Sequence, residues 1–212
     1  MIHRFGRRIS FFFDRPGPAG GDASGGNPGA AALQPMVDFV AFAEDCLLSG
    51  RIRLRAERLT DMLNEHEEFL LVDVMAQPLD TPEIVEVTEV LVRRDDLLMV
   101  TATGPRGDLA RRTRTRPTFV AVHIGPYAVR GNIHEYPGLD AVAGIKRRHP
   151  MVPLTDAWVD YPFGGKPLRQ RLGTAIVNRD RIDLIVKSLE HDVDVRDFGV
   201  EPDLVGLGRP GS

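Results

Sequence analysis

The feature that most constrains the fold is an internal similarity between the two halves of the chain. The matching positions are Phe39 and Phe119, Gly50 and Gly131, Asp73 and Asp156, and Val92 and Val177. Matching residues lie 80 positions apart at Phe39 and 85 positions apart at Val92. Because this spacing changes so little, the pattern predicts an internal duplication, with two copies of one unit and small insertions in the second.

Within each half, apolar residues alternate with polar ones over short runs, as in residues 37–43 and 119–124. Gly, Pro, Asn and Asp separate the runs, which is typical of antiparallel strands joined by turns. Gly125-Pro126 predicts a tight turn, and residues 93–96 and 178–181 predict matching polar turns between the last two strands of each half. The sequence therefore predicts an all-β protein.

One segment in each half departs from the strand pattern. In the first half, Leu59, Met62 and Leu63 have helical spacing, and Thr60 or Asp61 is a candidate for the helix cap. In the second half, residues 139–145 have a similar apolar pattern. Each half is thus expected to contain two strands, a short helical insertion and three further strands.

This order of elements resembles the small β-barrels of the Sm and SH3-like type, with Gly50 and Gly131 at the bend of the second strand. The segment Arg58-Leu59-Thr60-Asp61-Met62-Leu63-Asn64 also resembles the Arg-Leu-Ser/Thr-Asp-x-Leu-Asn motif of a bacterial family, a domain of unknown function. The resemblance implies two tandem closed small barrels and implies no activity. Closure would remove exposed sheet edges from each unit.

Five regions follow from this pattern. They are a disordered N-terminal arm at 1–35, a first small barrel at 36–103, a basic linker at 104–117, a second small barrel at 118–190 and a flexible tail at 191–212. The arm and the tail are rich in Gly and Pro and offer little apolar surface to bury.

The composition of the chain narrows the classes of protein to which it can belong. Net charge is −3 and the sequence pI is about 6.1, which argues against a protein coated in positive charge for nucleic acid. No apolar run approaches the roughly 18 residues of a membrane helix, so we expect a cytoplasmic protein. The single cysteine, Cys46, excludes an intramolecular disulfide and is expected in the core.

The linker carries the densest positive charge of the chain. Arg111, Arg112, Arg114 and Arg116 are candidates for contacts with phosphate groups, because guanidinium groups match phosphate geometry. Arg112 and Arg116 also have the spacing found in PilZ domains that bind cyclic di-GMP. The plainer interpretation is a solvated linker in an arginine-rich protein.

Two further groups are candidates for a partner surface. Asp61 and Asn64 lie in the bacterial family motif, where they either contact a ligand or partner or act locally as a cap and a turn residue. Trp158, Tyr161 and Phe163 form an aromatic cluster, which either provides a stacking platform or fills the space between the two units.

No residue pattern indicates catalysis. His123 and His134 are expected to face each other across a hairpin, where Glu135 or Asp156 could complete a metal site, but no closely spaced histidine pair supports one. We find neither a nucleophile elbow nor a phosphate-binding loop. We therefore expect no cofactor and a non-catalytic interaction or assembly module that binds a protein partner or itself. The alternative is a nucleic-acid-binding regulator that uses the arginine linker.

Overall fold

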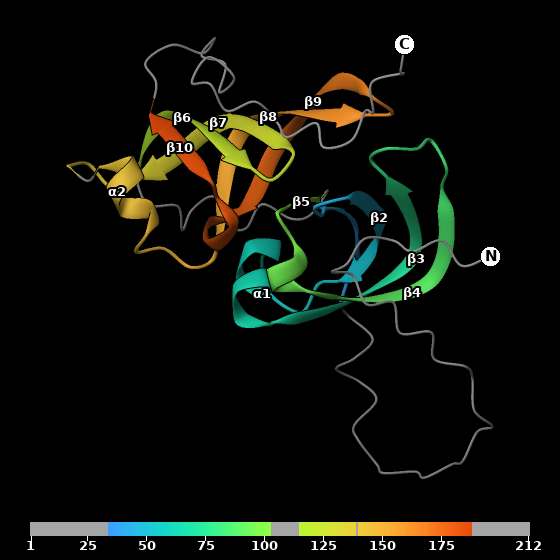
Figure 1. The fold of residues 1–212 in the computed structure, drawn as a ribbon. Helices are drawn as coiled ribbons and strands as arrows, with labels where there is room; N and C mark the ends of the chain where they lie inside the picture. The colour runs from blue at the N-terminus through green and yellow to red at the C-terminus, as the bar shows by residue number, and fades with distance from the viewer. Residues whose placement is uncertain (1–33, 103–114, 139, 188–212) are drawn as a thin grey trace, which may run out of the picture.

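The described part of the protein consists mostly of β-strands, as the sequence predicts. A computed structural model describes residues 34–102, 115–138 and 140–187. Ten strands form one antiparallel sheet in the order β10-β6-β7-β8-β9-β5-β1-β2-β3-β4, shown in Figure 1. Among these residues, no helix is long and apolar enough to cross a membrane.

The same order of elements occurs in both halves. The first half contains β1 (Met36–Phe42), β2 (Cys46–Arg53), α1 (Leu59–Glu65), β3 (Glu68–Pro78), β4 (Val85–Arg93), the 3₁₀ turn η2 (Arg94–Asp96) and β5 (Met99–Ala102). The second contains β6 (Arg116–Ile124), β7 (Tyr127–Glu135), α2 (Ala141–Ile145), β8 (Met151–Phe163), β9 (Lys166–Asn178), η4 (Arg179–Arg181) and β10 (Leu184–Lys187). The predicted polar turns are confirmed as η2 and η4.

The first helix forms where its apolar spacing predicts, but its predicted cap is wrong. Leu59, Met62 and Leu63 are all buried, so one face of α1 packs on the core. The helix begins at Leu59, so Thr60 and Asp61 lie inside its first turn and cannot act as its cap. The N-cap residue is instead Arg58, which makes no side-chain capping bond. In the second half, Asp140 caps α2 by accepting a bond from the Ala143 amide.

The sheet is open, whereas we expected two barrels that are each closed. In each half the fifth strand pairs with the first, as β5 with β1 and β10 with β6. Closure of the first half would require its fifth strand to pair with its own fourth strand. Instead, β5 pairs with β9 of the other half, so the two halves share one continuous sheet.

A glycine and an irregular aspartate bend the sheet at matching places. The registers of β2 with β3 and of β7 with β8 shift at Gly50 and Gly131. Opposite them, Asp73 and Asp156 both have a φ of 52°. A Cβ atom on Gly131 would lie 3.0 Å from the Thr155 carbonyl oxygen, and one on Gly50 would lie 3.0 Å from that of Val72. The bulges therefore require glycine because the neighbouring backbone lies so close.

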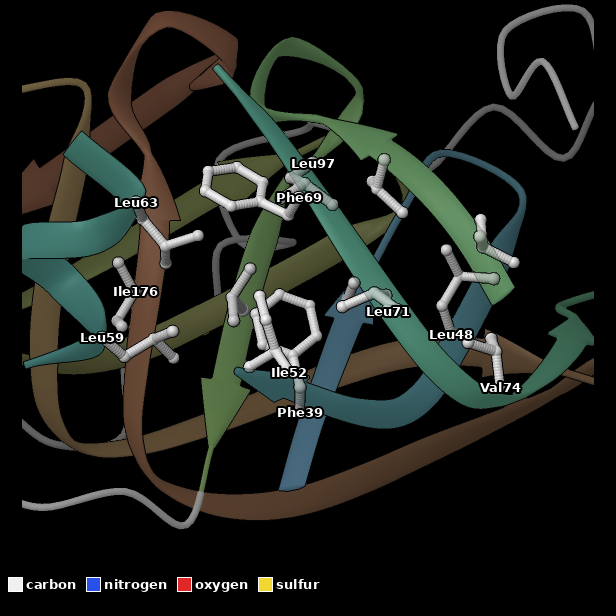
Figure 2. Close-up of a cluster of buried hydrophobic side chains, with 14 of the residues drawn as sticks. Phe39, Leu48, Ile52, Leu59, Leu63, Phe69, Leu71, Val74, Leu97 and Ile176 are labelled. Carbon is white, nitrogen blue, oxygen red and sulfur yellow. The ribbon is translucent and has the colours of Figure 1, made fainter. Parts of the chain in front are cut away.

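The core consists of two main apolar clusters, and each takes residues from both halves. The first cluster, shown in Figure 2, lies within the first half but includes Met151 and Ile176 of the second. The other lies within the second half but includes Phe42, Leu98 and Met99 of the first. The predicted burial of Cys46 is confirmed, at 1% exposure. The halves are therefore parts of one packed body.

Candidate assembly interface

The contact between the halves is a short edge-to-edge strand pairing. Met99 of β5 lies opposite Val177 of β9, and Val100 lies opposite Ile176. The pairing is extended by a hydrogen bond of 2.8 Å from the Asn178 amide to the Leu98 carbonyl. Such pairing satisfies the backbone groups that an edge strand otherwise presents to solvent.

Apolar side chains fill the space beside this pairing. Ile176 is only 4% exposed because it packs into the first half (Figure 2). On the other side, the rings of Phe42, Tyr127 and Tyr161 contact one another, with centroids 5.5 to 6.1 Å apart. The Tyr127 hydroxyl donates a bond of 2.7 Å to the Ala43 carbonyl, and burial raises the pKa of this hydroxyl well above its usual value.

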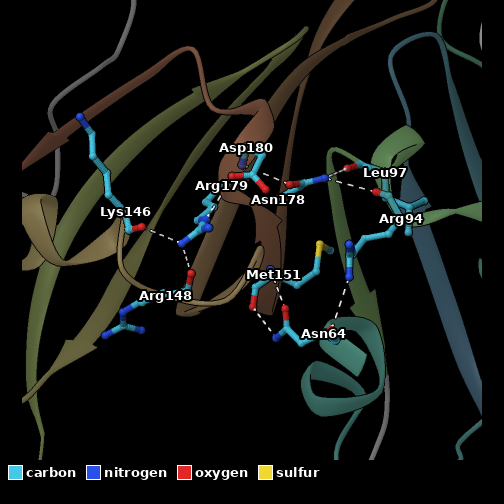
Figure 3. Close-up of polar contacts among 9 residues, drawn as sticks. All are labelled: Asn64, Arg94, Leu97, Lys146, Arg148, Met151, Asn178, Arg179 and Asp180. Atoms are coloured by element: carbon cyan, nitrogen blue, oxygen red, sulfur yellow. Dashed lines mark hydrogen bonds and ion pairs between the residues drawn. The ribbon is translucent and has the colours of Figure 1, made fainter. Parts of the chain in front are cut away.

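Two asparagines make further polar contacts between the halves, as Figure 3 shows. Asn64 accepts a bond of 2.9 Å from the Met151 amide and donates one of 3.1 Å to the Met151 carbonyl. Asn178 donates to the carbonyls of Arg94 and Leu97, at 3.2 and 3.0 Å. Met151 lies opposite Asn178 in the β8–β9 pair, so both asparagines act at the same end of the contact, where their side-chain amides bind backbone groups of the other half.

Two arginines occupy equivalent places in the halves. Arg94 donates to the carbonyls of Asn64 and His66, at 3.4 Å each. Arg179 donates to the carbonyls of Lys146, at 2.8 Å, and Arg148. Each arginine therefore ties its 3₁₀ turn to the C-terminal end of the helix of its own half and the residues after it. Asn64 occupies in the first half the place that Lys146 occupies in the second.

The two end strands of the sheet are the edges that remain. Among the described residues, β4 pairs only with β3 and β10 pairs only with β6. On β4, Leu91 is 44% exposed and lies opposite Leu70, which is 47% exposed. Exposed apolar residues on an edge strand are typical of a strand that pairs with another chain.

A basic face lies at the outer part of the β8–β9 hairpin. Trp158 lies opposite Arg171, whose guanidinium lies 5.8 Å from the centre of the indole ring. Asp160 forms ion pairs with Arg130 at 3.1 Å and Arg169 at 2.6 Å. Gly164 and Gly165 form the loop of this hairpin, with positive φ values.

The structure separates the residues of the predicted aromatic cluster. Trp158 is 43% exposed, whereas Tyr161 is 3% exposed and belongs to the core between the halves. Phe163 packs against the same core. Alternation along β8 explains the difference, because successive side chains of a strand point to opposite faces. Tyr161 and Phe163 therefore fill space between elements, and only Trp158 offers a large ring to a partner.

The other predicted site residues also differ in whether they are exposed or engaged in the fold. Asp61 is exposed in the first turn of α1, whereas Asn64 is engaged between the halves. Sequence reasoning missed this role, because nothing near Asn64 in the chain points to Met151. Arg116 is exposed at the start of β6, so the strand begins inside the predicted linker. Arg111, Arg112 and Arg114 lie outside the described residues, as do most of the predicted N-terminal arm and the predicted C-terminal tail.

The two histidines that we expected to face each other lie at different ends of the β6–β7 hairpin. His123 lies opposite Ala128 and 3.4 Å from Asp183, whereas His134 lies opposite Pro117 and contacts the Thr155 hydroxyl at 2.8 Å. Their positions in the chain put them on different strands, and the register keeps them apart. In the part of the chain that the structure describes, no group of three His, Cys, Asp or Glu residues is placed to hold a metal ion.

Cys46 has the environment of a structural cysteine. Burial, followed by the nearby carboxylate of Asp45, raises the pKa of its thiol to about 12. The thiol therefore stays protonated near neutral pH, which is unlike a nucleophilic cysteine.

Comparisons of the chain with protein-family models, with curated proteins and with solved structures found no match.

Proposed function

We propose that this protein is a non-catalytic assembly module that associates through the edges of its sheet. One observation carries the proposal: the sheet already joins its two halves edge to edge, through β5 and β9, while β4 and β10 are left at its ends. Unpaired strand edges with exposed apolar side chains are a general means of strand addition between chains.

We further propose that the halves are tandem copies of one unit related to the small Sm and SH3-like barrels. The repeated order of elements, the paired bulges at Gly50 and Gly131, and the equivalent arginines Arg94 and Arg179 support this interpretation. A repeated unit matters for assembly, because a contact made once between copies can be made again at each remaining edge.

Light scattering coupled to size-exclusion chromatography tests the proposal on the full chain of 23.5 kDa. We expect a mass that is a multiple of the single chain and that is unchanged when the salt concentration is raised. Salt should have little effect because backbone hydrogen bonds and apolar contacts are only weakly screened. A single-chain mass at every concentration tested would contradict the proposal.

Nucleic-acid binding is a second candidate, and the Trp158–Arg171 contact is the observation that favours it. An exposed ring beside Arg171, with Arg169 on the same face of β9, could stack on a base while the arginines contact phosphates. Fluorescence anisotropy with single-stranded RNA and DNA at several salt concentrations tests this function. Binding that weakens with salt and is lost on combined substitution of Trp158 and Arg171, or of the linker residues Arg112, Arg114 and Arg116, would support it, and no binding at low salt would exclude it.

A further inference from the structure

We propose that the assembly is head to tail: β10 of one molecule pairs antiparallel with β4 of the next. This proposal rests on the proposed function, and it names both the partner, a second copy of the chain, and the pairing register. It follows from the molecule's own β5–β9 contact, because β10 occupies in the second half the place of β5, and β4 occupies in the first half the place of β9.

The registers of the neighbouring strands identify the corresponding residues. Val92 lies opposite Phe69 on β3, as Val177 lies opposite Val152 on β8. One step back along each strand, Leu91 therefore corresponds to Ile176. Phe39 lies opposite Gly50 and Val120 lies opposite Gly131, so the structure aligns Phe39 with Val120 and not with Phe119 as the sequence suggested. His123 therefore corresponds to Phe42. Because Met99 lies opposite Phe42 and Leu184 lies opposite His123, Leu184 corresponds to Met99.

The contact inside the molecule then fixes the register between molecules. Because Val100 lies opposite Ile176, Ile185 of one copy is expected opposite Leu91 of the next. Leu184 is likewise expected opposite Val92. The exposure of the side chains fits this arrangement, since Ile176 is 4% exposed and its counterpart Leu91 is 44% exposed.

The same register brings opposite charges together along the two strands. Glu89 falls opposite Lys187, and Arg93 falls opposite Asp183, with all four side chains exposed. Within the molecule, Lys187 lies 3.9 Å from Asp140, and Asp183 contacts His123 and the Gly125 amide. These contacts leave the carboxylate and ammonium groups open to solvent, so a neighbouring chain can approach them.

A third pair of opposite charges lies beside the strands. In the molecule, Asn64 contacts the first residue of β8, Met151. The corresponding residues are Lys146, which follows α2, and Glu68, the first residue of β3, and both are exposed. Between molecules, Lys146 of one copy would therefore lie near Glu68 of the next. Opposite charges at three places favour this register over shifted ones.

A head-to-tail contact uses β10 of one partner and β4 of the other, so a pair of molecules retains one free β4 edge and one free β10 edge for further neighbours. Such an assembly closes into a ring if the rotation between copies allows, and otherwise it grows as a filament. The proposal therefore predicts either one closed oligomer or a concentration-dependent series of masses, rather than a two-fold dimer.

Site-specific cross-linking of the full chain tests the register. Leu91→Cys and Ile185→Cys are produced as separate chains with tags of different size, co-expressed, and treated with a short reagent that joins two thiols. We expect a product that contains one copy of each variant and no product from either variant alone. Native Cys46 serves as an internal background, since it is 1% exposed.

Val85→Cys provides the matched control, because Val85 is exposed on the same strand but lies six residues, about 20 Å, from Leu91. It should give no product with Ile185→Cys. A Leu91→Cys product with itself would show a two-fold β4 contact and overturn the proposal. If light scattering shows an oligomer but no mixed product forms, the register is wrong and the proposed function is unaffected. A single-chain mass by light scattering would overturn both.

Charge exchange gives a second measurement that needs no cysteine. Glu89→Lys should weaken association, because it places two cations opposite each other, and the double variant Glu89→Lys with Lys187→Glu should restore it. Failure of the double variant to recover, while Glu89→Lys alone weakens association, would contradict the predicted pairing of these two side chains.

Discussion

Asn64 and Asn178 connect the halves by offering side-chain amides in place of backbone groups. Asn64 is the clearer case, because its oxygen and nitrogen both bind the backbone of Met151 and its nitrogen also binds the Thr60 carbonyl at 2.9 Å. Alanine at this position would leave partly buried backbone groups without these partners, and a group left in that state costs more than the net value of one hydrogen bond.

We therefore predict that Asn64→Ala lowers the free energy of unfolding by about 1–3 kcal/mol. Urea denaturation followed by circular dichroism measures this change. Asp61→Ala is the matched control, since Asp61 is exposed on the same helix and its loss should change stability by less than about 0.5 kcal/mol. Equal effects of the two substitutions would contradict the role assigned to Asn64.

Cys46 makes a prediction about alkaline pH. Its pKa is raised from 9.0 to about 12 in the folded protein, so above pH 9 the unfolded chain loses the thiol proton while the folded chain keeps it. The contribution of the protonated thiol to the free energy of unfolding is therefore fully present below pH 9 and is lost as the pH rises toward 12.

Between pH 8 and pH 10 this thiol should lower the free energy of unfolding by about 1 kcal/mol. Urea denaturation at both pH values measures the change. Tyrosines of the unfolded chain also begin to lose protons in this range, so the difference in pH dependence between the native protein and Cys46→Ala isolates the thiol. Identical pH dependence of the two proteins would be incompatible with a buried thiol.

Single residues also show where sequence reasoning succeeds. Burial of Cys46 follows from its apolar neighbours, and burial of Leu59, Met62 and Leu63 follows from helical spacing. The role of Asn64 depends on a residue 87 positions away, and no local pattern contains that contact.

At the scale of elements, the two bulges set the curvature of the sheet. The register shifts at Gly50 and Gly131, together with the positive φ of Asp73 and Asp156, place an extra residue at the same point in each half. Added residues increase local twist and bend the strand that carries them, so β3 and β8 curve around the two core clusters.

We predict that Gly131→Ala and Gly50→Ala destabilise the protein by similar amounts, about 1–3 kcal/mol each. The physical reason is that a methyl group at either site lies 3.0 Å from a backbone oxygen, which cannot move without disturbing the bulge. Thermal and urea denaturation measure both variants, with Ser49→Ala on β2 as the control. A large loss at one glycine and none at the other would contradict the equivalence of the two bulges.

Most elements could be predicted from the sequence, because alternation, helical spacing and turn residues act over a few positions. Their order within each half and the polar turns η2 and η4 follow from such patterns. The predicted helix cap was wrong because a cap depends on the residue at which the helix begins, and helix propensity defines that residue poorly. The split between Trp158 and Tyr161 follows from strand alternation only once the strand is known to be continuous.

At the scale of the molecule, the sequence indicates two similar halves but not how they join. Backbone pairing between β5 and β9 uses groups that every residue carries, so no residue pattern distinguishes it from closure within each half. The same property makes the open edges of β4 and β10 suitable for further pairing. The proposed assembly would use between molecules the same type of contact that holds the two halves together.

The mass of Leu91→Lys in solution decides whether β4 is an assembly edge. Leu91 is exposed, so lysine should leave the fold intact while placing a charge opposite Ile185 of a neighbour. Met75→Lys is the control, because Met75 is 47% exposed on β3, away from the edge. By light scattering, we predict an oligomer for the native protein and for Met75→Lys, and a single chain of about 23.5 kDa for Leu91→Lys. An oligomer of unchanged mass for Leu91→Lys, or a single-chain mass for the native protein, would show that β4 is not an assembly edge.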